Sequence, residues 1–322
     1  MVATTSLPSS ILRSCLVGGA IGDALGRPLE HLTLTEIRDQ YGAEGLQNVS
    51  PMTITDDTQM TLFSFEGLLE AEKDEEMVSV YRAYRRWLTT QEQAEPSPEA
   101  SGLAAQSWLY ERRGPGKACL TGLQQVGADK VVNLDSKGCG AVMRAAPFGL
   151  FDYSLDEAFL LAAKAARYTH GHPTAAVSAG VFARLISLVS HGHSFSDAVR
   201  ETLRLLTYDI PRAGETRTAV REAVKASRQY PATPETVELL GSGWVAEEAL
   251  SIAVYCVLAT DNAADALHLA INHSGDSDSV GSICGNLLGA SGAELPAQWV
   301  AAVEGRDTID QLVSAVPASA SR

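Results

Sequence analysis

Apolar residues recur at the period of an α-helix along most of this chain. Residues 59–71 place their apolar side chains in one wide helical stripe, whereas a half-buried strand would alternate apolar and polar residues. Strand signals are few, and no Asn-Gly or Asp-Gly hairpin turn occurs. The pattern predicts an all-α fold. We expect further helices over residues 76–88, 155–168, 174–189, 196–206, 245–258, 263–271 and 280–289.

The composition favours the same fold and argues against several functions. Hydrophobic residues make up 45% of the 322 residues but aromatic residues only 6%, so the core must consist mainly of Ala, Leu, Val and Ile, as in closely packed helices. With 25 Lys and Arg against 39 Asp and Glu, the formal net charge is −14. Binding to nucleic acids or anionic membranes needs clustered positive charge, so we expect neither as a general property.

Cysteine usage and the N-terminal segment predict a cytoplasmic protein. The five cysteines include no CxxC pair, which indicates a reduced protein without a disulfide framework or structural zinc site. The N-terminal segment lacks the basic and apolar regions of a signal peptide. The longest uncharged apolar run, residues 249–259, is too short to span a bilayer, so we expect no membrane contact.

The chain is predicted to form one domain. Residues 89–101 and 112–117 are broken by Pro or Gly and are expected to be loops, but neither is long enough to link independent domains. We assign residues 1–10 to an N-terminal tail, 11–312 to the domain and 313–322 to a flexible C-terminal tail. The sequence leaves the oligomeric state open, and a monomer is compatible with it.

Two acidic segments, TDDT at 55–58 and GDSDS at 275–279, each precede a helical run. Capping alone could explain one of them, because Ser, Thr and Asp are preferred N-caps and the helix dipole favours anions. Paired acids exceed what a cap requires, however, and four carboxylates brought together would repel one another without a cation. If the fold joins the segments, oxygen donors of this kind suit two Mg²⁺ or Mn²⁺ ions better than zinc. The candidate ligands are Thr55, Asp56, Asp57, Asp276, Asp278 and Ser279.

Glycine recurs at every fourth position in two segments. Gly in a helix interior costs about 1 kcal/mol relative to Ala, so each series needs a structural reason. Neither series matches a nucleotide-binding glycine loop, whereas a flat ridge on one helix face lets two backbones approach closely. We expect these ridges to pack central helices together and to bring the acidic segments into proximity. The series are Gly18, Gly22 and Gly26, and Gly281, Gly285 and Gly289.

Six sequence blocks together carry a resemblance to a known family. They are GGAIGDALGRPLE (18–30), TDDTQMT (55–61), GCGAVMRAAPFGL (138–150), THGHPTA (169–175), GWVAEEALSIAVYCVL (243–258) and NHSGDSDSVGSICGNLLGA (272–290). In this order they are similar to the ADP-ribosylglycohydrolases, which include ADP-ribosylarginine hydrolases and the glycohydrolase that reactivates dinitrogenase reductase. The resemblance extends from about residue 11 to Trp299, and the two acidic motifs are specific only in combination.

The resemblance implies an orthogonal helical bundle in a single domain, with a binuclear Mg²⁺ or Mn²⁺ centre in a cleft. The family's ligand pattern falls on the six candidate ligands named above. Ser279 stands where the family usually has Thr, which keeps the hydroxyl and loses a methyl group.

The resemblance also implies residues that handle the substrate. Glu30 closes the first family motif, and Pro28 should end the preceding helix and leave Glu30 in a loop; without the motif, Glu30 would be taken for a solvated surface residue. Asp23 is expected to serve in packing or positioning. Cys139 stands where the family often has Asn. Implied substrate contacts are Gly116, Gly138, Gly140, Met143, His170, Ser274 and Gly275, with structural roles left open for Gly116 and His170.

The implied function is metal-dependent hydrolysis of the N- or O-glycosidic bond between ADP-ribose and a modified protein side chain, arginine first among the candidates. The catalytic candidates are Glu30, Asp56, Asp57 and Asp278, and which of them transfers the proton stays open. The partners would be ADP-ribosylated proteins or small ADP-ribose adducts. The alternatives are a catalytically weak binding or toxin-neutralising protein and a structural protein such as a lens crystallin. The intact set of metal residues argues against both.

Overall fold

The structure, a computed structural model, describes residues 4–125, 127, 130–208 and 210–317. Within these ranges the chain is helical, with isolated β-bridges such as Met52–Val303 and no β-strand. The buried apolar side chains form one continuous core. The predicted all-α fold in one domain is confirmed.

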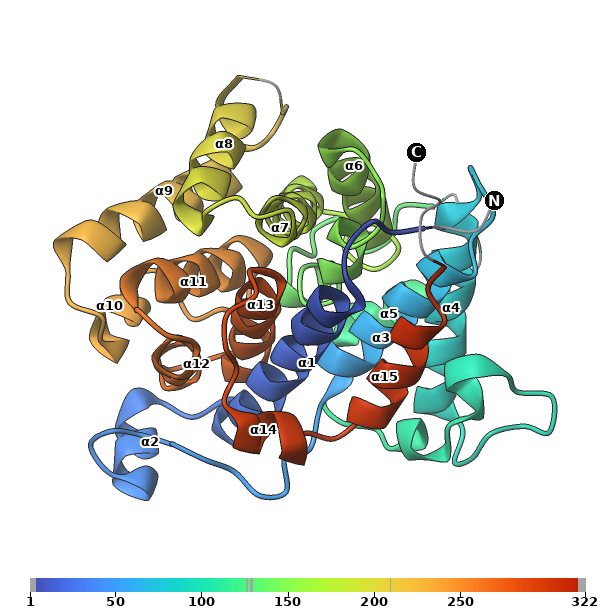
Figure 1. Cartoon of the computed structure of the whole chain (residues 1–322), viewed down its shortest axis with the longest axis horizontal. Helices are drawn as coiled ribbons and strands as arrows, with labels where there is room; N and C mark the ends of the chain where they lie inside the picture. The colour runs from blue at the N-terminus through green and yellow to red at the C-terminus, as the bar shows by residue number, and fades with distance from the viewer. Residues whose placement is uncertain (1–3, 126, 128–129, 209, 318–322) are drawn as a thin grey trace.

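The order of the helices along the chain defines the labels in Figure 1. The α-helices are α1 (Ser9–Gly26), α2 (Leu34–Tyr41), α3 (Asp56–Leu69), α4 (Glu76–Glu92), α5 (Lys117–Gln124), α6 (Leu155–Ala166), α7 (Pro173–Ser190), α8 (Phe195–Tyr208), α9 (Gly214–Gln229), α10 (Pro234–Glu238), α11 (Ala246–Ala259), α12 (Ala263–Ile271), α13 (Ser277–Ala290), α14 (Ala297–Ala302) and α15 (Arg306–Ser314). The 3-10 helices are η1 (Arg27–Leu29), η2 (Gly102–Ala105), η3 (Ser107–Tyr110), η4 (Cys139–Ala141) and η5 (Ala146–Gly149).

Each segment with a helical apolar period is a helix in the structure, with ends that differ by a few residues. The largest difference is in α4, which continues to Glu92, so the first part of the expected loop 89–101 is helical. Gln91 is buried there, and its Nε2 donates a hydrogen bond to Gln59 Oε1 at 3.0 Å. Tertiary packing therefore extends the helix past its apolar pattern. The period did not predict several helices that are short or strongly polar, namely α2, α5, α9, α10, α14 and α15.

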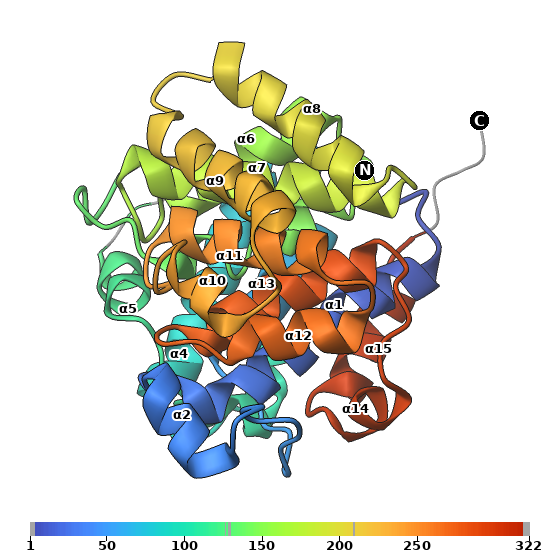
Figure 2. The same ribbon diagram turned by 90° about the vertical axis from the view of Figure 1, so that its left-hand side faces the viewer.

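Helices α1 and α13 lie side by side at the centre of the molecule (Figures 1 and 2). Their glycine ridges face each other in antiparallel order, with Gly18 against Gly285 and Gly22 against Gly281. A Cβ atom on any of these four residues would overlap a backbone carbonyl of the other helix. The predicted close packing is confirmed, and it holds the C-terminus of α1 beside the N-terminus of α13.

The other helices surround this pair and bury it. Helix α7 packs against α6 and α11, and α3 packs against both α1 and α4. By length and composition alone, Pro173–Ser190 is apolar enough to cross a membrane, but 89% of this segment is buried inside the fold. Its apolar side chains are therefore covered by protein, as expected for a core helix.

The described parts of both predicted tails are held by the domain. Thr5 Oγ1 donates to the Leu150 carbonyl at 2.8 Å, and the Ser6 N–H donates to Asp152 Oδ1 at 2.7 Å. At the other end, α15 extends to Ser314 and buries Val313. Residues 1–3 and 318–322 of the two tails lie outside the described residues.

The contact between the glycine ridges predicts a large effect of a single methyl group. We expect Gly22→Ala to lower the free energy of unfolding by about 3 kcal/mol, because the added Cβ meets backbone atoms that cannot rotate away. Urea denaturation measures this change. Gly214→Ala, at the start of α9 where a Cβ meets nothing within 4 Å, is the matched control and should be neutral or stabilising. Equal stability of the two variants would show that α1 and α13 are not in tight contact.

Candidate active site

A cavity of about 210 Å³ collects most of the predicted site residues. It lies where the N-termini of α3, α5 and α13 meet the loop after α1 and the η4 turn. The two acidic segments, from opposite ends of the chain, therefore come together as expected. The predicted residues that line the cavity are Glu30, Asp56, Asp57, Gly116, Gly138, Gly140, Met143, His170, Asp276, Asp278 and Ser279.

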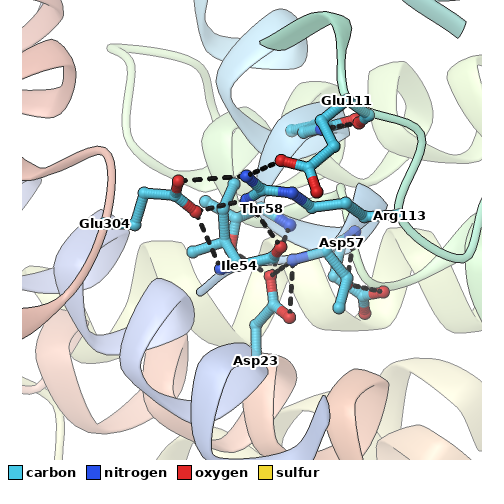
Figure 3. A network of polar contacts seen from close by, with 9 residues as sticks. Asp23, Ile54, Asp57, Thr58, Glu111, Arg113 and Glu304 are labelled. Carbon is cyan, nitrogen blue, oxygen red and sulfur yellow. Dashed lines mark hydrogen bonds and ion pairs between the residues drawn. The ribbon is translucent and has the colours of Figure 1, made fainter. Parts of the chain in front are cut away.

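Asp23 on α1 fixes the N-terminus of α3 (Figure 3). Its carboxylate accepts hydrogen bonds from the Thr55 N–H, 3.0 Å from each oxygen, from the Thr58 N–H at 3.1 Å and from the Thr58 hydroxyl. Burial raises the pKa of Asp23 to about 6, and the hydrogen bonds from Thr58 and Thr55 oppose that rise. Asp23 does not line the cavity. It is a positioning residue, in agreement with its expected role.

A second network holds the same segment from the other side (Figure 3). The Arg113 guanidinium donates to the Ile54 carbonyl at 3.2 Å and forms ion pairs with Glu304 and Glu111. Glu304 Oε2 in turn accepts from the Ile54 N–H at 3.1 Å, and the Arg113 carbonyl accepts from the Asp56 N–H at 3.1 Å. Glu304 lies beyond every family block, and no local pattern indicated its role.

The carboxylates of the first acidic segment differ in their partners. Asp56 Oδ2 accepts a hydrogen bond from the Gly116 N–H at 3.3 Å, which links α3 to the N-terminus of α5. Asp57 Oδ2 accepts from the Thr55 hydroxyl at 3.1 Å, so Thr55 lies behind the cavity with its oxygen directed at Asp57. Asp57 Oδ1 is buried without a hydrogen-bond partner.

The second acidic segment forms the first turn of α13. Asp276 Oδ1 and Asp278 Oδ1 both accept from the Ser279 N–H, at 3.2 and 3.0 Å. Asp276 Oδ2 accepts from the Cys139 thiol at 2.7 Å. Burial and the nearby Asp276 charge raise the pKa of Cys139 well above its usual range, so this side chain stays a thiol that can donate. Cys139 therefore contacts a candidate ligand and is more than an ordinary buried residue.

The cavity concentrates negative charge, although Lys117 also lines it. Burial raises the pKa of Asp56, Asp57 and Asp278 well above the usual range of a carboxylate, and neighbouring carboxylates raise it further. Among the described residues, no Lys or Arg forms an ion pair with these three or with Asp276. Such a group cannot be fully ionised unless a cation joins it.

The candidate ligand atoms are chemically suited to hard divalent cations. The candidate ligands offer carboxylate and hydroxyl oxygens only, and the unpartnered Asp57 Oδ1 is available to a ligand. In the part of the chain that the structure describes, no three His, Cys, Asp or Glu side chains already converge in a geometry that could hold a metal ion. Metal binding would therefore require some of these carboxylates to change position.

Glu30 lines the cavity beside an aromatic pair that the sequence did not predict. Burial raises the pKa of Glu30, against the opposing effect of His31, whose Nε2 lies 3.2 Å from Glu30 Oε1. The His31 ring stacks on Trp244, with ring centroids 4.8 Å apart and planes at 15°. Trp244 lines both this cavity and a neighbouring one. The position of Glu30 is thus tied to the loop that precedes α11.

His170 lies under the η4 turn. Its Nδ1 is 2.7 Å from Thr169 Oγ1, and burial, aided by the charge of Arg144, lowers the pKa of His170 to about 3, so the ring is neutral at physiological pH. A Cβ on either Gly138 or Gly140 would lie 3.1 Å from this ring. The glycines thus let the turn pack on the imidazole, in addition to any role in substrate contact.

Two of the predicted substrate contacts lie outside this cavity. Ser274 and Gly275 line the neighbouring cavity, of about 460 Å³, together with His31 and Trp244. Ser274 Oγ accepts from the Leu34 N–H at 2.8 Å and donates to Glu238. Gly275 has a φ of +125° and packs against the Ser242 carbonyl. In the structure both residues shape the turn before α13.

The family profile described as ADP-ribosylglycohydrolase matches residues 5–322. This chain belongs to the ADP-ribosylglycohydrolase family. It is 30% identical over 317 residues to an uncharacterized protein of Archaeoglobus fulgidus, with 94% of each chain covered. It is 26% identical to the ADP-ribosyl-[dinitrogen reductase] glycohydrolase of Rhodospirillum rubrum, over 89% of this chain and 88% of that protein. The resemblance expected from the sequence blocks is confirmed.

Further similarities support the same family and fold. The ADP-ribosylarginine hydrolase Tri1 of Serratia proteamaculans is 25% identical, over 93% of this chain and 77% of its own. A solved structure titled "ADP-ribosylglycohydrolase-related protein complex" matches with a TM-score of 0.67 at 23% identity, over 95% of this chain and 96% of that chain. The latter similarity shows that the two chains share the fold.

The hydrogen bonds to Asp23 predict that this residue stabilises the N-terminus of α3, which carries the first acidic segment. Asp23→Ala leaves the buried Thr55 and Thr58 N–H groups without an acceptor and should lower the free energy of unfolding by about 3 kcal/mol in urea denaturation. Asp310→Ala removes a half-exposed acid that pairs with Arg13 and should cost less than about 1 kcal/mol. If both variants lose the same small amount, Asp23 does not hold the N-terminus of α3.

Proposed function

We propose that this protein is a metal-dependent ADP-ribosyl hydrolase that releases ADP-ribose from a modified protein side chain, with arginine as the first candidate. Membership of the ADP-ribosylglycohydrolase family supports this proposal, as do the names of the Rhodospirillum and Serratia relatives. The observation that carries it is the meeting of two acidic segments in one cavity, where no Lys or Arg of the described residues forms an ion pair with the four aspartates.

The proposed metal ligands are the oxygens of both acidic segments. Bound Mg²⁺ or Mn²⁺ ions would lower the pKa of a bound water and anchor vicinal hydroxyls of the ribose. Asp57 Oδ1, which is buried without a hydrogen-bond partner, is one of these oxygens. The six ligands would be Thr55, Asp56, Asp57, Asp276, Asp278 and Ser279.

The side chains that line the cavity would stabilise charge, transfer the proton and orient the substrate. As the bond from the ribose to the guanidinium breaks, positive charge develops on the sugar, and the carboxylates of Asp57 and Asp278 would stabilise it. The leaving guanidine needs a proton. Glu30 is our first candidate as donor, because it lines the cavity and burial raises its pKa, with Asp56 and Asp278 as alternatives. Neutral His170 would orient the substrate by hydrogen bonding.

Release of ADP-ribose tests the proposed activity. With Mg²⁺ present, the protein should cleave an arginine-linked substrate, and Asp56→Ala and Asp57→Ala should each slow release by about 100-fold or more, since each removes a proposed ligand charge. Asp310→Ala, far from the cavity lining, should retain full activity. Serine-linked, nucleobase-linked and O-acetyl-linked substrates in the same assay identify the preferred bond. If the unmodified protein and all variants are equally inactive on every substrate, the proposed hydrolase activity is refuted. The alternative of a binding protein then remains.

Binding of free ADP-ribose tests the metal requirement without turnover. The acidic cavity should repel a diphosphate unless cations offset its charge, so we expect calorimetry to give an affinity at least about tenfold weaker after chelation. The Asp57→Ala variant should show a smaller dependence on added Mg²⁺. Equal affinity with and without a chelator would rule out the metal-dependent site.

A further inference from the structure

A further hollow lies between helices α8 and α9, away from the acidic cavity. It has a volume of about 550 Å³, and its walls come from both helices, with Leu258 of α11 beneath them. Figure 2 shows α8 and α9 running beside each other across one side of the molecule, and we call the hollow between them the α8–α9 groove. None of the predicted site residues lines it.

The groove is strongly basic in a chain whose net charge is −14. Four exposed arginines line it, Arg200 and Arg204 from α8 and Arg221 and Arg228 from α9, and none of the described residues that line it is Asp or Glu. Arg200 pairs with Asp197 one turn away. For the other three, the described part of the chain provides no ion pair or side-chain hydrogen bond. Uncompensated like charges repel one another, so this arrangement favours an anionic ligand.

The basic surface continues beyond the groove. A smaller hollow of about 370 Å³ shares Thr207 and Tyr208 with it and adds Arg212 and Arg217, and none of the described residues in its lining is acidic. Along α8 the lining of the groove extends from Ser196 to Tyr208, which corresponds to about 18 Å of helix. The arginines come from both helices, one turn apart on α8 and two turns apart on α9, so an elongated ligand with several anionic groups fits this lining better than a single phosphate or carboxylate.

The floor of the groove is aliphatic. Val199 and Leu203 of α8, Val224 of α9 and Leu258 of α11 lie between the arginines. Single-stranded nucleic acids are usually bound by a series of aromatic rings on which bases stack. The described lining offers one such ring, Tyr208 at the end of the groove, and a phosphodiester backbone gains nothing from the aliphatic floor. A floor of this kind between charged walls is typical of grooves that receive the apolar face of an amphipathic helix.

We infer that the α8–α9 groove docks an acidic amphipathic helix of a protein partner. The apolar side chains of the partner lie on Val199, Leu203, Val224 and Leu258, and its Asp and Glu residues pair with the arginines on both walls. Charge complementarity speeds the encounter and selects acidic segments over basic ones. This inference rests on the geometry of the groove and does not depend on the proposed hydrolase activity.

Fluorescence polarisation with a defined probe tests the docking site. The probe is a labelled peptide of about 15 residues with Leu on one helical face and Glu on the other. It should bind the unmodified protein at micromolar concentration, and more weakly as ionic strength rises. The double variant Arg204→Glu/Arg221→Glu should weaken binding at least about tenfold, since it reverses one charge on each wall. Both residues are exposed, so thermal unfolding should be unchanged.

Matched controls separate docking from general electrostatic attraction. Arg82→Glu reverses an exposed arginine of α4, at the opposite end of the molecule in Figure 1, and should bind the probe like the unmodified protein. A peptide with Lys in place of Glu should not bind. The inference is overturned if the double variant and Arg82→Glu bind the probe equally, or if single-stranded oligonucleotides bind the groove more tightly than the peptide. It is also overturned if the protein alone forms a dimer that the double variant dissociates, since the groove would then hold a second copy.

Discussion

The backbone contact between α1 and α13 is the constraint on which the rest of the structure depends. Gly22 and Gly281 meet with no side chain between them, so the facing ends of the two helices are fixed relative to each other. From this pair, Asp23 holds the N-terminus of α3, and Asp276 and Asp278 extend from the first turn of α13. The packed helices therefore determine the geometry of the acidic cavity, and the loops that line it are positioned by these helices.

The same arrangement explains how the chain maintains an electrostatically unfavourable site. Buried carboxylates need hydrogen bonds or a counter-charge. Here backbone N–H groups, the Thr55 hydroxyl and the Cys139 thiol provide the hydrogen bonds, while Arg113, which lies beside the segment, is already paired with Glu304 and Glu111. The protein thus supplies shape and hydrogen bonds, whereas Lys117 lines the cavity without an ion pair to these carboxylates in the described part of the chain. The acidic cavity therefore favours the binding of an added cation. The α8–α9 groove has the opposite charge and favours the binding of an anion.

The sequence predicted what depends on local pattern and missed what depends on tertiary neighbours. Apolar periodicity located the buried helices, and the spacing of the glycines predicted their closest contact. Helix α9 was not predicted because its buried face is narrow and made of small residues, with Val220 as its largest apolar side chain. Glu304 and the stacking of His31 on Trp244 depend on segments distant along the chain, so no local signal could show them. The basic groove was hidden because net charge averages over the whole surface.

The pairing of α1 with α13 also bears on how the chain is made. It joins the first helix to one of the last, and contacts of such large sequence separation form late, because the intervening chain must first be available. During synthesis the glycine ridge of α1 therefore has no partner until α13 has emerged. Each new molecule thus passes through a stage in which α3 and its two aspartates exist but the opposite wall of the cavity does not. Because α13 lies near the end of the sequence, an unfinished chain cannot form the complete acidic cavity.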